Sequence, residues 1–353
     1  MIINDLDGYY IVFDTKNWNT ELDTLAIDLY RALLTSGNQI IPIFHVQNEL
    51  DDNPNAVIIP ESNRLLLENI KLSKCIRKIA PDIVLFPIFP PPVDLKWGFK
   101  GKVYPTFHDC AFLKYRKTLN FAAKYYLTPK ALWSLKWIDG IITISESEKR
   151  QFTEYTNTPI YNLGENIAIS FKGVSEKVNI KLIDKWNLKP NSYFISVSTI
   201  EPRKNFKYLL RVLAPILKEK KMRLVLVGRK GWGQDEELKV LIDQMKDYLI
   251  FTEYVTEETL ITLYHYAHAF ALLSLDEGFG RTPFEAVACG CKRIILSDIE
   301  IFHETFDGNA TFLPLGNEEA ARKELQKSVD VMVNDDFSIP FDVMEKRIGQ
   351  LFN

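Results

Sequence analysis

Two patterns of apolar positions alternate along the chain. Short apolar runs, typical of buried parallel strands, are separated by longer stretches with helical periodicity. One helical stretch places apolar side chains at Phe206, Leu209, Leu210, Leu213 and Leu217, which form one face of a helix with 3.6 residues per turn. Strands that alternate with helices of this length predict parallel sheets joined by right-handed crossovers.

The alternation occurs in each half of the chain. The strands predicted in the first half are Tyr10–Phe13, Ile40–Phe44, Ile83–Phe86, Val103–Phe107, Ile141–Ile144 and a short one near Ile160–Leu163, with helices at Leu22–Leu34, Leu65–Ile79 and roughly Lys114–Trp137. Those predicted in the second half are Tyr193–Ser198, Arg223–Val227, Ile250–Thr252, Phe270–Leu273 and Arg293–Leu296.

A polar segment within Lys172–Pro190 separates the halves. We therefore predict a first domain over 1–172, a second over 173–336 and a last helix within 337–353. The fold class is α/β, with two Rossmann-like, doubly wound parallel-sheet domains. Such domains face each other across a cleft at the carboxyl ends of their strands, where ligands bind.

The composition narrows the choice of function. The chain has 353 residues, of which 46% are hydrophobic and 25% charged, as in a soluble globular protein. Its net charge of −3 gives no indication of a general nucleic-acid partner. No apolar run approaches a membrane span, and the N-terminus lacks the layout of a signal peptide, so we expect a cytoplasmic protein. Four cysteines in a chain of this length predict no disulfide framework.

The stretch 275–286, which reads LDEGFGRTPFEA, carries the strongest chemical signal. It follows an apolar run and enters a predicted helix through a turn with two glycines. Thr282 is the expected N-cap and Pro283 fits the first helical position. The first turn of that helix would offer free N–H groups and a positive dipole end, which together bind anions such as phosphate.

Two glutamates, Glu277 and Glu285, lie eight positions apart in this stretch. In one interpretation, Glu285 only completes a capping box and Glu277 is a solvated loop residue. In the other, both carboxylates bind a sugar nucleotide, because an ionised carboxylate can accept from two neighbouring hydroxyls at once. Glu285 would then bind the ribose and Glu277 the transferred sugar. We favour the second interpretation.

These residues resemble the donor-site signature of the family-four retaining glycosyltransferases, which have the GT-B fold. The likeness comprises E-x7-E within EGFG-x-x-P-x-EA-x-A-x-G, and it continues to Ser297. It implies that Glu277 acts at the catalytic centre and that Glu285 binds the donor. It also implies that the backbone at Phe279, Gly280, Arg281 and Thr282 holds the donor diphosphate.

A second loop of the same half resembles this family. Residues 198–205 read STIEPRKN between a strand and a helix, and Lys204 matches the lysine that grips the donor phosphates in the family. Two adjacent cations could neutralise a departing diphosphate, although a solvated basic turn is the simpler explanation of the pattern alone. Many relatives carry an arginine where this chain has Ser198, and whether Arg203 replaces that charge is left open.

Three further positions enter through the resemblance. His108, followed by Asp109, ends a strand of the first half and matches a histidine near the transferred sugar, although a lone histidine is more often structural. The glycine-rich turn at Gly228 would lie near the nucleotide base. Backbone groups at Tyr254 and Val255 could read the edge of that base.

Two features of the first domain bear on the mechanism. Relatives usually have a glycine-rich turn after the first strand, whereas residues 14–21 read DTKNWNTE, so the backbone there cannot approach a phosphate as closely. Asp5 and Asp7 have the spacing of the metal-binding carboxylates in other glycosyltransferases, but they precede any strand. We therefore expect no metal ion and no cofactor.

The segment 112–137 mixes lysine and arginine with aromatic and aliphatic side chains. A helix of this composition can lie on an anionic bilayer, although a solvated basic face above a core-facing stripe is the simpler explanation. Because acceptors in the family are often lipid-linked, peripheral contact with the inner face of the membrane is a second expectation.

The sequence thus predicts a retaining, metal-independent glycosyltransferase that uses a nucleoside-diphosphate sugar. The resemblance suggests a glycan or lipid-linked glycan as acceptor and a role in cell-surface polysaccharide or lipopolysaccharide assembly. Two alternatives remain: a non-catalytic scaffold that binds a nucleotide sugar, and a GT-B sugar-nucleotide epimerase. A nicotinamide dehydrogenase is disfavoured, because the glycines after Val227 do not have the dinucleotide spacing.

Overall fold

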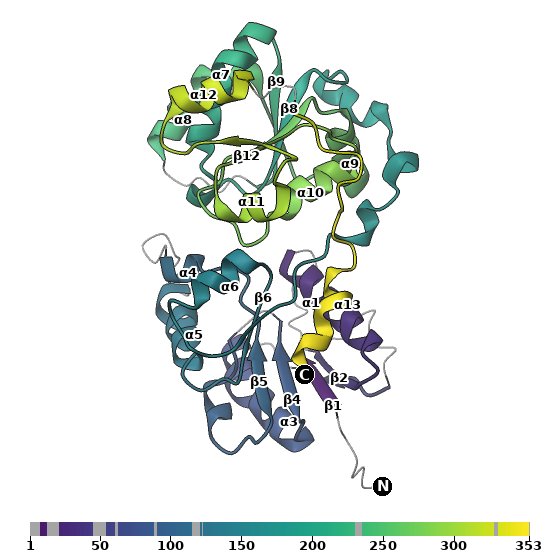
Figure 1. Cartoon of the computed structure of the whole chain (residues 1–353), viewed down its shortest axis with the longest axis vertical. Helices are drawn as coiled ribbons and strands as arrows, with labels where there is room; N and C mark the ends of the chain where they lie inside the picture. Colours follow the sequence, from purple (N-terminus) through teal and green to yellow (C-terminus); the bar gives the residue numbers. More distant parts are fainter. Residues whose placement is uncertain are drawn as a thin grey trace. The chain divides into compact units, whose positions relative to one another are not determined.

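A computed structural model describes residues 8–12, 21–44, 54–60, 63–87, 90–114, 121, 123–229, 235–327 and 331–352. The chain divides into two compact units, shown in Figure 1. Unit 1 comprises Met1–Asn166 with Asp342–Asn353, and unit 2 comprises Ile167–Phe341.

These boundaries differ by a few residues from 172/173 and 336/337, and hydrogen bonds explain the difference. The Asn166 side chain accepts from the backbone N–H groups of Val343 and Met344, at 2.8 and 3.2 Å, and donates to Glu345 at 3.0 Å. These bonds fix the C-terminal segment to unit 1. One residue later, the Ile167 N–H donates to the carbonyl of Pro340 within unit 2.

Unit 1 is built on a parallel five-stranded sheet with the order β3-β2-β1-β4-β5. Its strands are β1 (Gly8–Val12), β2 (Gln39–Phe44), β3 (Val57–Ile58), β4 (Ile83–Phe86) and β5 (Lys102–Pro105), and a separate parallel pair is formed by β6 (Ile141–Thr143) and β7 (Ile160–Asn162). Its α-helices are α1 (Glu21–Thr35), α2 (Arg64–Leu66), α3 (Leu72–Ile79), α4 (Ala111–Lys114), α5 (Thr128–Ser134), α6 (Glu146–Phe152) and α13 (Val343–Arg347). π-Helical turns at Leu67–Lys71 and Ala123–Leu127 precede α3 and α5. Helix α13 packs on α1.

Unit 2 is built on a parallel six-stranded sheet with the order β10-β9-β8-β11-β12-β13. The strands are β8 (Tyr193–Val197), β9 (Arg223–Val227), β10 (Leu249–Glu253), β11 (Ala269–Leu272), β12 (Ile294–Ser297) and β13 (Thr311–Leu313). The helices are α7 (Phe206–Lys220), α8 (Glu236–Gln244), α9 (Glu257–Tyr266), α10 (Arg281–Ala288), α11 (Glu300–Phe306) and α12 (Glu318–Lys327).

Both sheets reverse their winding direction once. In unit 2 the chain runs outward from β8 through β9 and β10, and then returns to the other side of β8 as β11. In unit 1 the same reversal lies between β1 and β4. The loops that follow the two central strands diverge at such a switch point, which is where doubly wound sheets bind ligands.

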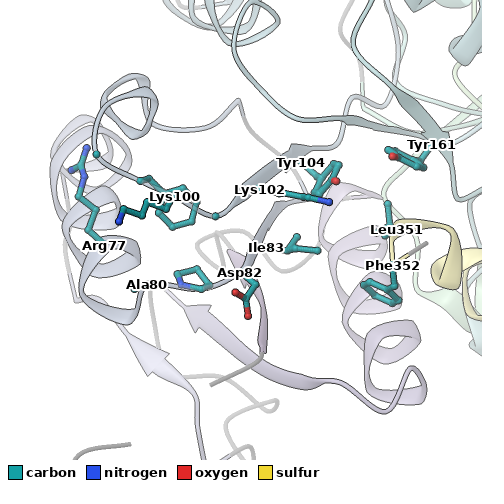
Figure 2. A pocket seen from close by; sticks show the side chains of 14 residues that line it. Arg77, Ala80, Asp82, Ile83, Lys100, Lys102, Tyr104, Tyr161, Leu351 and Phe352 are labelled. Atoms are coloured by element: carbon teal, nitrogen blue, oxygen red, sulfur yellow. The ribbon is translucent and has the colours of Figure 1, made fainter. Parts of the chain in front are cut away.

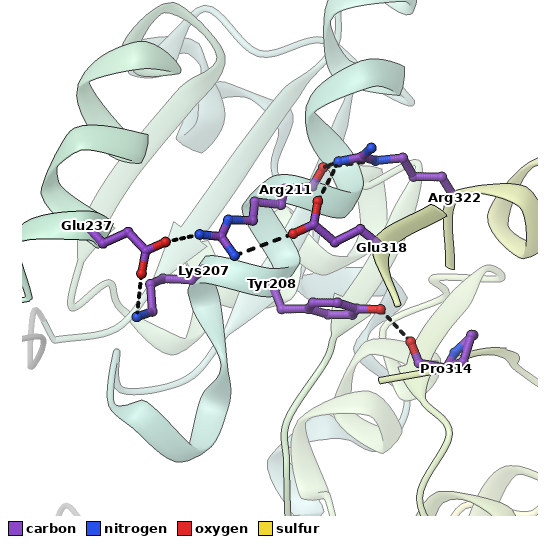
Figure 3. Close-up of polar contacts among 7 residues, drawn as sticks. All are labelled: Lys207, Tyr208, Arg211, Glu237, Pro314, Glu318 and Arg322. Atoms are coloured by element: carbon purple, nitrogen blue, oxygen red, sulfur yellow. Dashed lines mark hydrogen bonds and ion pairs between the residues drawn. The ribbon is translucent and has the colours of Figure 1, made fainter. Parts of the chain in front are cut away.

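Helix α7 shows how the apolar pattern becomes a core. The predicted face is buried: Leu209, Leu210, Leu213 and Leu217 are each at most 1% exposed and join the main cluster of unit 2. Its polar side carries a network that ties α7 to α8 and α12, shown in Figure 3. Arg211 contacts Glu237 of α8 and Glu318 of α12, and Arg322 also donates to Glu318 at 2.9 Å.

The predicted elements agree well with the observed ones. Strands β4 and β9 match the predicted ranges to the residue. The predicted helix at 114–137 is helical in most of its described part, as α4, the π-helical turn and α5, but α5 ends at Ser134 and residues 135–137 form a turn. Residues 115–120 and 122 lie outside the described part of the chain. Strands β3 and β13, of two and three residues, were not predicted.

Candidate functional site

The switch point of unit 2 brings the two predicted donor motifs together. One loop follows β8 and carries Arg203 and Lys204, and the other follows β11 and carries Glu277. The Leu275 N–H donates to the carbonyl of Arg203 at 2.8 Å, so the loops are joined through their backbones. Residues 73 positions apart therefore form one cluster.

Glu277 is the centre of this cluster. Its side chain is buried, and it accepts from the Lys204 ammonium at 2.7 and 2.9 Å, from Arg203 at 3.1 Å and from the Ser274 hydroxyl at 2.6 Å. A carboxylate has about four lone-pair positions, so these four contacts use its acceptor capacity. The expected contact with sugar hydroxyls stays a prediction, and it requires one of these donors to move.

The charge state of Glu277 follows from opposing effects. Burial on its own raises the pKa of the carboxyl, but the Lys204 and Arg203 charges and the hydrogen bonds from Lys204 and Ser274 lower it, and the net pKa lies below the ordinary value of 4.5. Glu277 is therefore ionised at neutral pH, and it holds two cations at the carboxyl end of β8.

Arg203 also forms hydrogen bonds with the loop that carries Glu277. Its Nη1 donates to the carbonyl of Asp276 at 2.8 Å as well as to Glu277, and its Nη2 lies 3.2 Å from Glu201. Ser198, where many relatives carry arginine, has a buried hydroxyl for which the described residues supply no hydrogen-bond partner. The Arg203 guanidinium therefore braces the Glu277 loop, and a further role at the Ser198 position stays open.

Helix α10 begins at Arg281, one residue before the predicted N-cap Thr282, so that prediction is wrong. The residue at the N-cap position is Gly280, which has a left-handed φ of 84°. A Cβ there would lie 2.6 Å from the Phe302 ring, so close packing and backbone conformation both require glycine. Phe279 stacks on Phe284 with ring centroids 5.2 Å apart, which fixes the turn to the helix that follows it.

Glu285 lies on α10, one turn beyond its start, and is 9% exposed. The hydroxyl of Tyr264, a fully buried side chain on α9, donates to its Oε2 at 3.2 Å. Sequence reasoning missed both Tyr264 and Ser274. Tyr264 and Glu285 lie on different helices, and the Ser274–Glu277 contact depends on the conformation of the loop that carries both residues. Neither contact follows from the spacing of residues in the sequence.

The predicted base-binding turns lie beside the same cluster. Gly228 has a φ of 135°, and a Cβ there would lie 2.2 Å from the carbonyl oxygen of Ser198, so this glycine allows the β8 and β9 loops to touch. Its N–H donates to the carbonyl of Glu253. Tyr254 is 74% exposed, directly before Val255. Residues 230–234, which complete the glycine-rich turn, lie outside the described residues.

His108 belongs to unit 1. It follows β5, and its Nε2 lies 3.0 Å from the carbonyl oxygen of Pro87, directly after β4. Because β4 borders the switch point of this sheet, His108 is held at the edge where a ligand is expected. Residues 14–20 of the predicted first loop and Asp5 and Asp7 lie outside the described part of the chain.

The two helices that follow β6 and the β8 loop begin differently. The Ser145 hydroxyl accepts from the Glu148 N–H at 3.1 Å at the start of α6. Asn205 precedes α7, but it has a left-handed φ of 54° and makes no side-chain capping bond. Within the described ranges, no cluster of three or more histidine, cysteine or acidic side chains could hold a metal ion.

The fold and this cluster define a class of protein. Two parallel sheets of Rossmann-like order form the GT-B fold of glycosyltransferases. Residues 179–330, which lie within unit 2, match the model of the glycosyl transferases group 1 family. The resemblance drawn from the donor motif is thereby confirmed for this part of the chain.

Two mannosyltransferases are similar to this chain in sequence. The serotype-specific mannosyltransferase WbdA of Escherichia coli is 31% identical over 170 residues, which are 44% of this chain but only 20% of WbdA. The O-antigen chain mannosyltransferase RfbU of Salmonella typhimurium is 24% identical over 272 residues, 72% of this chain and 74% of RfbU.

A solved structure extends the likeness to the whole fold. The crystal structure of Anabaena Alr3699/HepE in complex with UDP and glucose superposes with a TM-score of 0.65, and the alignment covers 98% of this chain and 95% of that one. The two sequences are 13% identical, so this likeness concerns the fold.

Proposed function

We propose that the protein is a retaining glycosyltransferase that moves a sugar from a nucleoside-diphosphate donor to a glycan or lipid-linked glycan acceptor. One observation carries this proposal. The Lys204–Glu277–Arg203 cluster and the start of α10 lie at the switch point of the group 1 domain, with Glu285 one turn further along the helix. A diphosphate with its ribose matches such an arrangement of cations, helix-terminal N–H groups and a carboxylate.

In the proposed complex, Lys204, Glu277 and Glu285 have different roles. Lys204 has three donors, of which its contacts with Glu277 use two, so one remains for a donor phosphate. The N–H groups at the start of α10 would bind the same diphosphate, and Glu285 would accept from the ribose hydroxyls. Glu277 would keep Lys204 in place and would contact the transferred sugar after a local shift of one donor.

The reaction would break the bond between the anomeric carbon and the phosphate oxygen. Lys204, Arg203 and the α10 amides would stabilise the charge that develops on the leaving diphosphate, often the largest single term in catalysis. The acceptor hydroxyl would attack from the face that the phosphate leaves and would transfer its proton to that phosphate. His108 stays a proposed hydrogen-bonding partner of a sugar hydroxyl. No step in this scheme requires a metal ion.

Mannose is the sugar we propose to be transferred, because the curated relatives WbdA and RfbU are named mannosyltransferases. O-antigen or a related lipopolysaccharide chain is the corresponding acceptor, in line with the RfbU name. A thermal-shift panel of UDP, GDP, dTDP and ADP would identify the base, since a ligand that binds only the folded state raises Tm.

Two assays separate this proposal from its alternatives. Incubation with the stabilising nucleotide sugar and an oligosaccharide acceptor should produce a longer glycan, and NMR of the new linkage should show the anomeric configuration of the donor. A scaffold would yield no transfer and no donor hydrolysis. An epimerase would interconvert donors without an acceptor. An inverted linkage would refute the retaining mechanism.

We also propose that unit 1 rests on an anionic membrane through exposed aromatic and basic side chains. Phe121 and Tyr125 are 79% and 62% exposed and lie 4.8 Å apart, with the Lys124 ammonium 5.5 Å from the Tyr125 ring. A second group comprises Lys96, Trp97 and Trp133, of which only Trp133 belongs to the predicted segment 112–137. The Lys96 ammonium lies above both tryptophan rings. Aromatic rings with adjacent cations suit a headgroup layer.

Liposome flotation tests this contact. The protein should float with vesicles that contain anionic lipid and should be released by high salt, because screening weakens surface electrostatics. Tyr125→Ser should reduce flotation, whereas Tyr155→Ser, at a residue of unit 1 that is 41% exposed, should not. Flotation that is absent, or equal with neutral vesicles, would refute the proposal. In the described part of the chain, no helix is long and apolar enough to cross a bilayer.

A further inference from the structure

A pocket of about 700 Å³ opens in unit 1, away from every residue assigned above to donor binding. Figure 2 shows its lining, which includes the start of β4 at Ile83, the start of β5 at Lys102, the end of α3 and the C-terminal turn at Phe352. It therefore lies at the amino ends of β4 and β5. His108 is held at the opposite end of β4, about four strand residues or roughly 13 Å away.

The charges of this pocket are not balanced. Of its cations, Arg77 is paired with Asp94 at 2.8 Å and also donates to the carbonyl of Trp97. Lys100 and Lys102 are exposed, and no carboxylate of the described residues forms an ion pair with either. Asp82 is the single acid in the lining. Two lysines without counter-charges in a concave site attract anions.

One end of the pocket is aromatic. Tyr104 and Tyr161 meet edge to face, with ring centroids 5.8 Å apart and an interplanar angle of 82°. Phe352 also lines this pocket, from the C-terminal turn. Tyr104 is buried, whereas Tyr161 and Phe352 are half-buried, and their rings present a flat apolar surface against which the C–H face of a sugar can pack.

The walls of the pocket are held by close backbone contacts. A Cβ at Gly101 would lie 2.1 Å from the carbonyl oxygen of Pro81, and a Cβ at Gly140 would lie 2.3 Å from the Tyr104 ring. The Lys102 N–H donates to the carbonyl of Asp82 at 2.7 Å. The site is therefore preformed, and binding a ligand would require little ordering of the backbone.

We propose that this pocket is a second ligand site, which binds a phosphorylated sugar. The sugar ring would pack at the Tyr161 and Phe352 end, and the phosphate would pair with Lys100 and Lys102. The volume lies within the range of roughly 300–1,000 Å³ that is usual for small-molecule sites. This proposal does not depend on the donor site, because all lining residues belong to unit 1.

Titration calorimetry on the full chain tests the site, with mannose 6-phosphate as probe and with free mannose and inorganic phosphate as comparisons. We expect saturable binding of the sugar phosphate that is at least about tenfold tighter than that of either fragment, since the sugar ring and the phosphate contact different side chains of the pocket. Saturating nucleoside diphosphate should not displace it.

Charge reversal at the pocket provides the decisive variant. The double substitution Lys100→Glu and Lys102→Glu should weaken binding by at least about tenfold, because attraction becomes repulsion. The matched control is Lys74→Glu with Lys78→Glu, which reverses two exposed lysines of α3 that do not line the pocket. This control and Lys204→Ala should bind the sugar phosphate as the wild type does.

Several results would overturn the proposal. These are the absence of saturable binding, equal binding of inorganic phosphate and sugar phosphate, an unchanged affinity in the double variant, an equal loss in the matched control, and displacement by nucleoside diphosphate. Because all four lysines are exposed, the variants should keep the wild-type Tm, and a shared Tm confirms that a loss of binding is local.

Discussion

The two glutamates of the donor motif, Glu277 and Glu285, are the same residue type in one short stretch of sequence, yet the protein holds their carboxylates in different ways. Glu277 is fixed by charge, through Lys204 and Arg203, and by the Ser274 hydroxyl. Glu285 is oriented by a neutral donor, the Tyr264 hydroxyl. The same side chain in one motif can thus anchor a cationic cluster, as Glu277 does, or be oriented by a neutral donor, as Glu285 is, for which we propose ligand binding.

This difference predicts different losses on substitution. Changes in the Glu277 cluster should act mainly on turnover, because they disturb the charges that would stabilise the leaving group. Changes around Glu285 should act mainly on nucleotide affinity, because ribose contacts are the same before and during the reaction.

The largest effect is expected from Lys204→Ala. It removes the cation nearest the proposed diphosphate, so turnover should fall by about 10² or more, and nucleoside-diphosphate affinity should also decrease. Steady-state transfer kinetics and calorimetry measure the two quantities. Lys207→Ala, at an exposed lysine that pairs with Asp235 and Glu237, is a suitable control and should transfer at the wild-type rate. Near-wild-type turnover in Lys204→Ala would remove Lys204 from the mechanism.

Glu277→Gln should separate turnover from affinity. The variant keeps the shape of the side chain but removes the negative charge that Lys204 and Arg203 share, so turnover should fall by about 10² or more while the Kd for nucleoside diphosphate does not rise. The same kinetic and calorimetric measurements apply. An unchanged turnover would show that the ionic anchor is not needed for transfer.

A smaller effect is expected at the other glutamate. Tyr264→Phe removes the hydroxyl that orients Glu285, and nucleoside-diphosphate affinity should fall by about tenfold with little change in turnover at saturation. Tyr193→Phe is the matched control, since it removes an equally buried hydroxyl whose bond at 2.7 Å goes to the Leu263 carbonyl instead. If both variants lose affinity equally, the Tyr264 contact is merely structural. For a 3′-deoxynucleotide, which lacks one ribose hydroxyl, the difference in affinity between wild type and Tyr264→Phe should be smaller.

The smallest effect is expected from a change of pH above 5, which should leave the stability difference between wild type and Glu277→Gln unaltered. Since the folded-state pKa of Glu277 lies below its unfolded value, its ion pairs stabilise the protein fully above that value and lose their effect as the pH falls through the folded pKa. Urea titrations should therefore give a constant difference in unfolding free energy between wild type and Glu277→Gln from pH 8 to about pH 5, and a decline only below about pH 4.3. A difference that already shrinks between pH 7 and pH 6 would contradict the assignment.

The sequence predicted the strands and the donor motifs because both are local patterns. Strand β9 and the buried face of α7 follow from runs and periods that can be read along the chain. The start of α10 was misplaced at Thr282, because the left-handed conformation of Gly280 and its contact with Phe302 allow the helix to begin earlier.

Contacts across the fold could not be predicted in the same way. Tyr264 and Glu285 lie on different helices, and the contacts of Glu277 with Lys204 and Arg203 depend on which strands flank the switch point. The charge and the residue type of each partner were visible in the sequence, but the order of the strands was not. That order determines which two loops meet, and therefore which side chains form the site.

The central claim is that a nucleoside diphosphate binds at the start of α10. A crystal structure with the nucleotide that most raises Tm tests it most directly. We predict phosphate oxygens within hydrogen-bond distance of the N–H groups at Gly280–Thr282 and of the Lys204 ammonium, with ribose hydroxyls on Glu285. Phosphates bound elsewhere, with Lys204 and Glu285 making no contact to the ligand, would contradict the account.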